Sequence, residues 1–211
     1  MGQVTDSRFV RALRAEGSGD AERTQLIAAM AEALRDAPLT AITPADVATR
    51  AGVPRDRFFQ HFPDVAACYL ATYEASASLL RAETASAVIE GTGRPYDERI
   101  ALGVRAYLET LASEPGLARA FLRDVQDAGP EALRRRRTVN EGFAAMIQAL
   151  AEQHADELPD GYAVHPDMAR ELVEALEELT LLSIDGDRIA DLPRLTDTAT
   201  RMIHAALVAG A

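Results

Sequence analysis

The chain has 211 residues and a formal net charge of −11, with 48% hydrophobic and only 5% aromatic residues. This length can bury a sizeable core, and abundant alanine and leucine with few aromatic residues favour helices over sheets. A single cysteine excludes an intramolecular disulfide, and no N-terminal stretch combines a basic start with an apolar run of signal-peptide or membrane-span length. We therefore expect an all-α, cytoplasmic protein.

The acidic charge is unevenly distributed along the chain. Residues 1–62 contain 8 arginines and 8 acidic residues, whereas residues 63–211 contain 14 arginines and 25 acidic residues. Nucleic-acid binding depends on positive potential, so the net charge argues against it, but the neutral first part leaves it open. Residues 1–19, with Arg8, Arg11 and Arg14, predict a flexible basic arm, which is either a solvated tail or a contact to the DNA backbone or minor groove.

The first firm helix is expected to begin near residue 20 and to run to about residue 35. Glycines and polar residues at 17–20 precede it, and Pro38 ends it. Its apolar residues recur at helical spacing: Leu26, Ile27, Met30 and Leu34.

Residues 43–62 have the layout of a helix-turn-helix. Thr43 can cap a helix whose first position is Pro44, and Gly52 permits the sharp turn after it. The next helix is short and holds Phe58 and Phe62 on one face, because residues four apart lie on the same side of a helix. We expect six side chains to face inward: Val47, Ala48, Ala51, Val53, Phe58 and Phe62.

The outward side of the second of these helices carries the residues expected to contact DNA. Arg55 and Arg57 supply charge and bidentate donors, Gln60 can engage adenine, and the helix N-terminus adds a backbone anion site. Asp56 and His61 lie on the same exposed start and flank. A short helical hairpin with exposed arginines is also a common ordinary surface, so both interpretations stay open on spacing alone.

From residue 64 the chain has longer amphipathic helices separated by brief breaks that contain glycine or proline. They are expected at residues 64–90, 96–113, 115–127, 130–155, 166–184 and 193–208. With the three short helices before them, about nine helices result.

Residues 51–64, AGVPRDRFFQHFPD, resemble the signature of TetR-family transcriptional regulators, and the similarity covers roughly residues 20–80. In that signature, alanine-glycine-valine precedes a short helix that ends in an aromatic residue, a variable residue, histidine or tyrosine, and phenylalanine. The resemblance implies an all-α fold with a DNA-binding domain at 20–80, whose motif spans 43–62, and a helical ligand-binding and dimerisation domain at 81–211. Such a protein is no enzyme and needs no cofactor.

The resemblance also implies roles for individual residues. Thr43 is then a phosphate contact, Arg55 and Asp56 face bases, and Arg57 contacts a phosphate or a base.

Several positions near the end of the motif are informative in the same way. His61 is expected near the DNA backbone, and Phe59 stands where many relatives have a phosphate-binding tyrosine. Pro54 replaces the usual serine and removes a capping side chain, and Val65 replaces a lysine that commonly touches phosphate. These departures predict weakened contacts rather than a different fold.

Apolar residues on the middle helices are mostly expected to form core, and a few to line an effector pocket. The pocket candidates are Tyr73, Tyr107, Phe121, Phe143 and Met146. The four arginines at 134–137 sweep most of a helix's circumference, so at least one should face a neighbouring helix and meet an acidic partner or an anionic ligand. An acidic cluster is expected on the solvated side of a helix: Glu171, Glu174, Glu177 and Glu178.

The last two helices have apolar faces wider than one internal contact requires, so a second surface is expected to meet a partner. The expected interface residues are Leu172, Leu176, Leu179, Met202 and Ala206, and Val173, Leu181, Ile203 and Leu207 widen the faces. The resemblance points the same way, to a four-helix bundle formed by the last two helices of each subunit.

Other chemistries find little support in the sequence. Cys68 is expected in the core, without a second cysteine for redox sensing, and the histidines at 61, 154, 165 and 204 share no metal-ligand spacing. Together with these observations, the resemblance implies a homodimeric repressor that binds a palindromic operator in double-stranded DNA and is released by a small, largely apolar effector. The alternative is a helical small-molecule-binding protein with a vestigial DNA-binding head.

Overall fold

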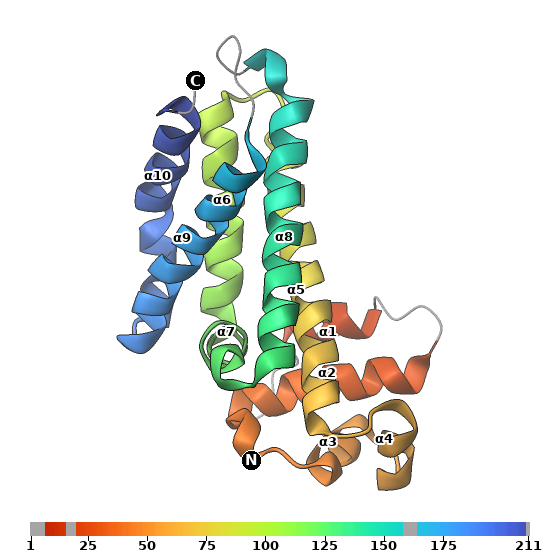
Figure 1. Ribbon diagram of the computed structural model, residues 1–211. Helices are drawn as coiled ribbons and strands as arrows, with labels where there is room; N and C mark the ends of the chain where they lie inside the picture. Colours follow the sequence, from red (N-terminus) through yellow and green to blue (C-terminus); the bar gives the residue numbers. More distant parts are fainter. Residues whose placement is uncertain (1–6, 16–19, 158–163, 210–211) are drawn as a thin grey trace. The chain divides into compact units, whose positions relative to one another are not determined.

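The computed structural model describes residues 7–15, 20–157 and 164–209, with the backbone alone at 127 and 207–209, and every regular element in this part is a helix. The described residues form ten α-helices, α1 to α10, together with short 3-10 segments and a π-helical turn (Figure 1). The all-α prediction is therefore confirmed. The chain forms two compact units: unit 1 comprises Met1–Leu79 and Gly116–Ala132, and unit 2 comprises Leu80–Pro115 and Leu133–Ala211.

Unit 1 begins with a helix where the sequence predicted a flexible arm. α1 (Arg8–Ala15) packs on α2 (Ala21–Asp36) and buries three apolar side chains, those of Phe9, Val10 and Leu13. The Ser7 hydroxyl accepts the N–H groups of Phe9 and Val10, and Arg14 forms an ion pair with Glu32 of α2. The expectation of a flexible arm is thus wrong for residues 7–15, because the amphipathic pattern is long enough for one buried face; residues 1–6 and 16–19 lie outside the described part.

The three-helix head of unit 1 consists of α2, α3 (Pro44–Ala51) and α4 (Arg55–His61), with a short 3-10 turn, η1 (Leu39–Ala41), after α2. In Figure 1, α2 runs between α1 and the α3–α4 pair. The start of α5 (Val65–Glu90) completes the core of this unit. Six of the most buried side chains lie here: Leu26, Met30, Val47, Phe58, Cys68 and Tyr69.

A segment far along the chain, Gly116–Ala132, also belongs to unit 1, which differs from the predicted division at residue 80. It holds α7 (Pro115–Ala118), a π-helical turn η2 (Arg119–Arg123) and a 3-10 turn η3 (Asp124–Asp127), in place of the single helix expected at 115–127. The Tyr69 hydroxyl donates to the Ala120 carbonyl at 2.8 Å, and the Phe121 ring lies 5.6 Å from the Tyr73 ring. These contacts tie the segment to α5 within unit 1.

Unit 2 contains the rest of α5, α6 (Tyr96–Ser113), nearly all of α8 (Pro130–Gln153), the 3-10 turn η4 (Ala155–Glu157), α9 (Pro166–Asp185) and α10 (Thr196–Ala209). A 3-10 segment, η5 (Ile189–Leu195), precedes α10 and packs with it on α6. The last helix therefore begins after Pro193 rather than at it. On α8 and α9, Ala144, Ala169 and Val173 form a buried cluster against Phe143 and Ile147.

Candidate nucleic-acid interface

The first turn of α3 is closed by a reciprocal capping box. The Thr43 hydroxyl accepts the Asp46 N–H at 3.3 Å, and the Asp46 carboxylate accepts the Thr43 N–H at 2.9 Å and its hydroxyl at 2.6 Å. These hydrogen bonds, those from the Thr43 side chain above all, lower the pKa of Asp46. The capping predicted from Thr43 and Pro44 is confirmed, and it satisfies N–H groups that a helix start leaves open.

The turn between α3 and α4 depends on Gly52. Its φ of 71° lies in the left-handed region that favours glycine. The Gly52 N–H donates to the Thr49 carbonyl at 3.2 Å, and the Val53 N–H donates to the Ala48 carbonyl at 3.0 Å. This pairing is a Schellman ending, which reverses the chain direction within two residues and sets α4 beside α3.

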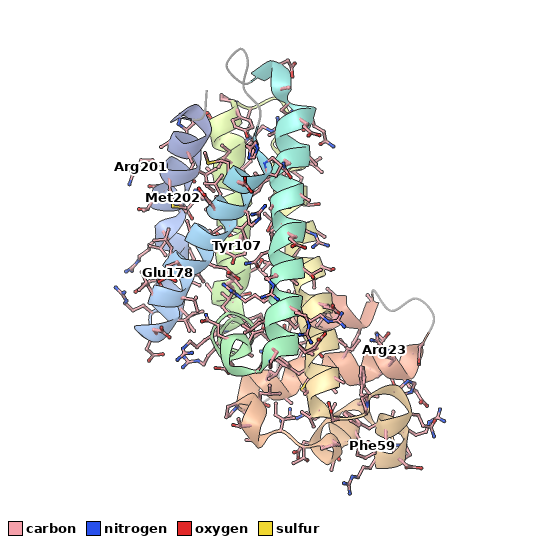
Figure 2. All side chains as sticks on the ribbon, viewed as in Figure 1. Arg23, Phe59, Tyr107, Glu178, Arg201 and Met202 are labelled. Atoms are coloured by element: carbon pink, nitrogen blue, oxygen red, sulfur yellow. The ribbon has the colours of Figure 1, made fainter. Side chains whose placement is uncertain are left out.

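The apolar side of α4 anchors it in unit 1. Phe58 is fully buried, Phe62 follows it one turn later, and their ring centroids lie 5.9 Å apart. The guanidinium of Arg23 lies 5.2 Å from the centroid of the Phe62 ring. Phe59, by contrast, is 47% exposed on the outer side of α4 (Figure 2), with the Arg55 guanidinium 5.8 Å from its ring centroid.

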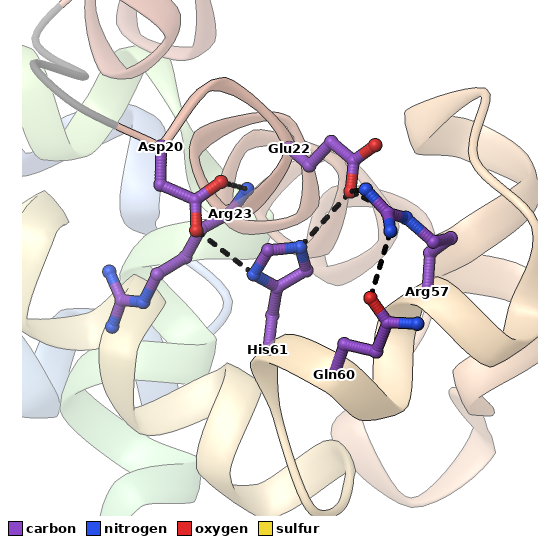
Figure 3. Close-up of polar contacts among 6 residues, drawn as sticks. All are labelled: Asp20, Glu22, Arg23, Arg57, Gln60 and His61. Carbon is purple, nitrogen blue, oxygen red and sulfur yellow. Dashed lines mark hydrogen bonds and ion pairs between the residues drawn. The ribbon is translucent and has the colours of Figure 1, made fainter.

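A polar cluster joins α4 to the N-terminus of α2 (Figure 3). Arg57 donates from Nε and Nη2 to Glu22 Oε2 at 2.9 and 2.8 Å, and from Nη1 to Gln60 Oε1 at 2.9 Å. His61 places Nδ1 3.1 Å from Asp20 Oδ2 and Nε2 3.2 Å from Glu22 Oε2. Asp20 is also the N-cap of α2. We call these five residues, Asp20, Glu22, Arg57, Gln60 and His61, the α2–α4 clamp.

The charges in the clamp stabilise one another. Hydrogen bonds from Arg57 and then His61 lower the pKa of Glu22, and the hydrogen bond to Glu22 raises the pKa of Arg57. Sequence reasoning missed Asp20 and Glu22, because an acidic N-cap and an acidic first turn are already explained by the helix they begin. Their contact with α4 is visible only in three dimensions.

Of the residues expected at the DNA, five are exposed on the outer side of the helix-turn-helix: Thr43, Arg55, Asp56, Phe59 and Gln60. Arg57 and His61 are instead partly buried in the clamp. The first five side chains are thus accessible, although Gln60 also accepts from Arg57, whereas Arg57 and His61 contact the start of α2.

The effector candidates form two groups in different units. Tyr73 and Phe121 pack together in unit 1, whereas Tyr107 and Phe143 form an edge-to-face pair in unit 2, with ring centroids 6.0 Å apart. Met146 is partly buried in unit 2. The interior of unit 2 therefore combines aromatic side chains from α6 and α8.

Of the four successive arginines at 134–137, Arg136 faces a neighbouring helix and meets an acidic partner there. It forms an ion pair with Glu177 of α9, which also accepts from the Asn140 amide at 3.0 Å. Glu177 is 6% exposed, so its expected place on a solvated face is wrong; Glu171, Glu174 and Glu178 are exposed as predicted. Glu177 occupies the inner side of α9 because it has charged and amide partners there, as buried carboxylates require.

Cys68 and His154 have surroundings that suit structural roles. Burial raises the pKa of the Cys68 thiol to about 12, which disfavours the reactive thiolate. His154 contacts the Arg99 guanidinium. Within the part of the chain that the structure describes, no group of three acidic, histidine or cysteine side chains is arranged to hold a metal ion. None of the helices described is both long and apolar enough to cross a membrane.

The outer faces of α9 and α10 carry apolar side chains. Leu176, Leu179, Met202 and Ala206 are partly buried, and Leu182 is 56% exposed. Leu172 is only 4% exposed within the chain and so offers little surface to a partner. The side chain of Leu207 lies outside the described part.

No protein-family model and no curated protein matches the chain. Several solved structures do. The fatty acid degradation regulator FadR from Bacillus halodurans is 14% identical, with a TM-score of 0.73 over 89% of this chain and 96% of that one. FadR from Bacillus subtilis, in complex with stearoyl-CoA, is 15% identical, with a TM-score of 0.70 over 85% and 96%. Thermus thermophilus FadR, a TetR-family repressor in complex with lauroyl-CoA, is 20% identical, with a TM-score of 0.64 over 88% and 94%. The chain therefore has the fold of TetR-family transcriptional regulators.

Proposed function

We propose that the protein is a ligand-responsive transcriptional repressor that binds a palindromic operator as a homodimer. The observation that carries this proposal is the helix-turn-helix of unit 1. A capping box begins its first helix, and a glycine in the left-handed conformation forms the turn. Arg55 and Phe59 are exposed on its second helix. Arginine recognises guanine through two hydrogen bonds in the major groove, and an aromatic ring can contact a thymine methyl group.

The surface proposed to meet DNA consists of the exposed residues of α3 and α4. Thr43, at the N-terminus of α3, is suited to a phosphate, and Arg55 and Asp56, at the N-terminus of α4, to base edges. Phe59 and Gln60 continue this surface along α4. This surface carries both positive and negative side chains, so it does not produce a strong positive field. Sequence-specific contacts therefore have to supply most of the affinity for DNA.

The test is selection of duplexes from a random library by the purified protein, together with binding to the DNA that flanks its own gene. We expect enrichment of a partly palindromic sequence. Arg55→Ala should relax the base preference, with a loss of about 1 to 3 kcal/mol for the selected duplex. Arg94→Ala, which removes an exposed arginine from unit 2, is the matched charge control and should bind as the wild type does.

The second candidate is a helical small-molecule-binding protein with a vestigial DNA-binding head. The net charge of −11 and the engagement of Arg57 by Glu22 favour it. Failure to enrich any sequence, with only weak and strongly salt-dependent retention of DNA, would support this alternative.

Effector binding is proposed for the interior of unit 2, near the pair formed by Tyr107 and Phe143. These two aromatic rings suit contact with a largely apolar ligand, and two of the similar structures contain stearoyl-CoA or lauroyl-CoA. Long-chain acyl-CoA thioesters are therefore the first class to test. Binding to the native state should raise the melting temperature, by an amount equivalent to about 2.7 kcal/mol at a ligand concentration 100 times the dissociation constant. Coenzyme A without an acyl chain is the control.

Dimerisation is proposed through α9 and α10. Leu179 and Leu182 on α9 and Met202 on α10 are accessible apolar side chains, and they support a four-helix bundle between subunits as the proposed interface. A dimer places two helix-turn-helix motifs on successive major grooves when their spacing is about 34 to 36 Å.

A further inference from the structure

The two arginines of α4 have very different surroundings. Arg55 is exposed, with its guanidinium above the ring of Phe59. Arg57, only two residues later, has all three guanidinium nitrogens engaged, two by Glu22 and one by Gln60 (Figure 3). A phosphate that approached Arg57 would meet the negatively charged Glu22 carboxylate, which would repel it. The phosphate would have to displace this carboxylate to bind Arg57.

His61 lies one turn after Arg57 and joins the same helix end. Its two ring nitrogens face two carboxylates, of Asp20 and Glu22. Asp20 is itself held by the Arg23 N–H at 3.1 Å, and the Arg23 guanidinium lies over the Phe62 ring. The polar side of α4 is therefore fastened at two successive turns to the N-terminus of α2.

α4 depends on such contacts for its orientation. It has seven residues, and its N-cap, Pro54, makes no side-chain capping hydrogen bond. A helix this short has little stability of its own in water. Phe58, with Phe62 at the end of the helix, anchors its apolar side in the core, and the contacts of its polar side with α2 add a constraint on its rotation about its own axis.

We propose that Arg57 and His61 are positioning residues, which fasten α4 to α2 through Glu22 and Asp20 and set the direction in which Arg55 and Phe59 face the major groove. This inference rests on the proposed DNA-binding function. It assigns Arg57 a role different from the phosphate or base contact that the sequence predicts, and it makes Glu22 a contributor to DNA binding although it is acidic.

The test compares Glu22→Gln, Arg57→Ala and the double variant on a duplex selected by the wild-type protein and on a random-sequence duplex, over a series of salt concentrations. Glu32→Gln, which removes one negative charge from the same helix and breaks a different arginine pair, is the matched control. We expect each clamp variant to lose about tenfold in affinity for the selected duplex, with the double variant no weaker than the weaker single variant. Affinity for the random duplex and the salt slope should stay those of the wild type.

Arg57→Lys separates positioning from a merely structural role. Lysine can pair with Glu22 but cannot engage two partners in the same plane, so it should restore part of the preference for the selected duplex. Melting temperature and circular dichroism report whether each variant folds. The ratio of selected to random affinity is the decisive measurement, because general loss of folded protein lowers both affinities together.

The opposite pattern would overturn the inference. If Arg57 contacts a phosphate, Glu22→Gln should strengthen binding to both duplexes more than Glu32→Gln does, and Arg57→Ala should reduce the salt slope by about one per subunit. A measurement without DNA tests the clamp itself: Glu22→Gln, but not Glu32→Gln, should speed hydrogen exchange at the Phe62 amide, which donates to Phe58 in α4. Unchanged exchange would overturn the clamp, whereas failure to select any duplex would overturn the proposed function alone.

Discussion

Thr43 and Asp46 together stabilise the N-terminus of α3. The Thr43 hydroxyl accepts one N–H of the first turn, and its removal leaves that group without its partner. We expect Thr43→Ala to lower the free energy of unfolding by about 1 kcal/mol, as replacement of other capping residues does. Urea unfolding measures this change, and Thr43→Ser, which keeps the hydroxyl, should retain most of the stability.

The same capping box predicts a pH dependence. Thr43 lowers the pKa of Asp46 below its ordinary value of 3.8, so the ionised carboxylate stabilises the folded state at pH values above 3.8. That contribution is lost as the pH falls below 3.8 through the lower folded-state pKa. The stability difference between wild type and Asp46→Asn should therefore be constant near neutral pH and shrink on acidification. A difference that persists unchanged to pH 2 would contradict this interpretation.

Side-chain roles were predictable where local sequence determines them and not where a distant residue does. The cap at Thr43 and the turn at Gly52 follow from the residue type and its neighbours. Arg55 and Arg57 look alike in the sequence, and only the fold brings Glu22, 35 positions earlier, to the second of them. Glu177 is similar, because its partner Arg136 lies 41 positions away.

The segment that contains α7 is held to α2 by a close backbone approach. A Cβ atom at Gly116 would lie 2.5 Å from the Arg35 Cα and 2.7 Å from its carbonyl oxygen, and backbone cannot move aside as a side chain can. We expect Gly116→Ala to destabilise the protein by about 1 to 3 kcal/mol, the usual cost of overpacking. Thermal and urea unfolding test this.

Gly52→Ala provides the contrast, since its Cβ would have nothing within 4 Å and meets only the cost of the left-handed conformation. Replacement by asparagine instead of alanine should therefore affect stability differently at the two positions. Asparagine, which tolerates that conformation, should recover stability at Gly52 and not at Gly116. Equal recovery at both positions would show that close packing at Gly116 is unimportant.

Helix boundaries were predictable where proline and glycine mark them, as at α3, α6 and α9. The prediction failed in α7 to η3, where one helix was expected but the backbone widens and then tightens its turns. It also failed at η5, where a break was expected up to Pro193 and the structure has a 3-10 segment before α10. The π-helical turn at Arg119–Arg123 occurs where Tyr69 and Phe121 pack, a tertiary constraint that no local pattern encodes. Domain limits failed for the same reason, because Gly116–Ala132 joins unit 1 through long-range contacts.

Assembly of the proposed dimer should depend on the apolar surface of α9. Leu182 is 56% exposed, so Leu182→Glu leaves the protomer core intact while placing a charge in the proposed interface. We expect a monomer by sedimentation and a large loss of operator affinity, because two heads no longer bind as one unit. Ile89→Glu, at an equally exposed apolar residue of α5, is the control and should stay dimeric. A dimeric Leu182→Glu would place the interface elsewhere.

The chain itself connects the proposed effector site to the DNA-binding head. α5 contributes residues to both units, and Gly116–Ala132 of unit 1 connects α6 and α8 of unit 2, so the backbone passes between the units three times. A ligand that favours one arrangement of α6 and α8 can therefore act on the segment that packs against α2 and α5.

If lauroyl-CoA lowers affinity for the selected duplex by some factor, linkage requires that the duplex lower affinity for lauroyl-CoA by the same factor. Calorimetric titration of lauroyl-CoA with and without saturating duplex measures this, and we expect the weaker binding in the presence of DNA. Equal dissociation constants would show that the two sites are independent and that lauroyl-CoA does not control DNA binding.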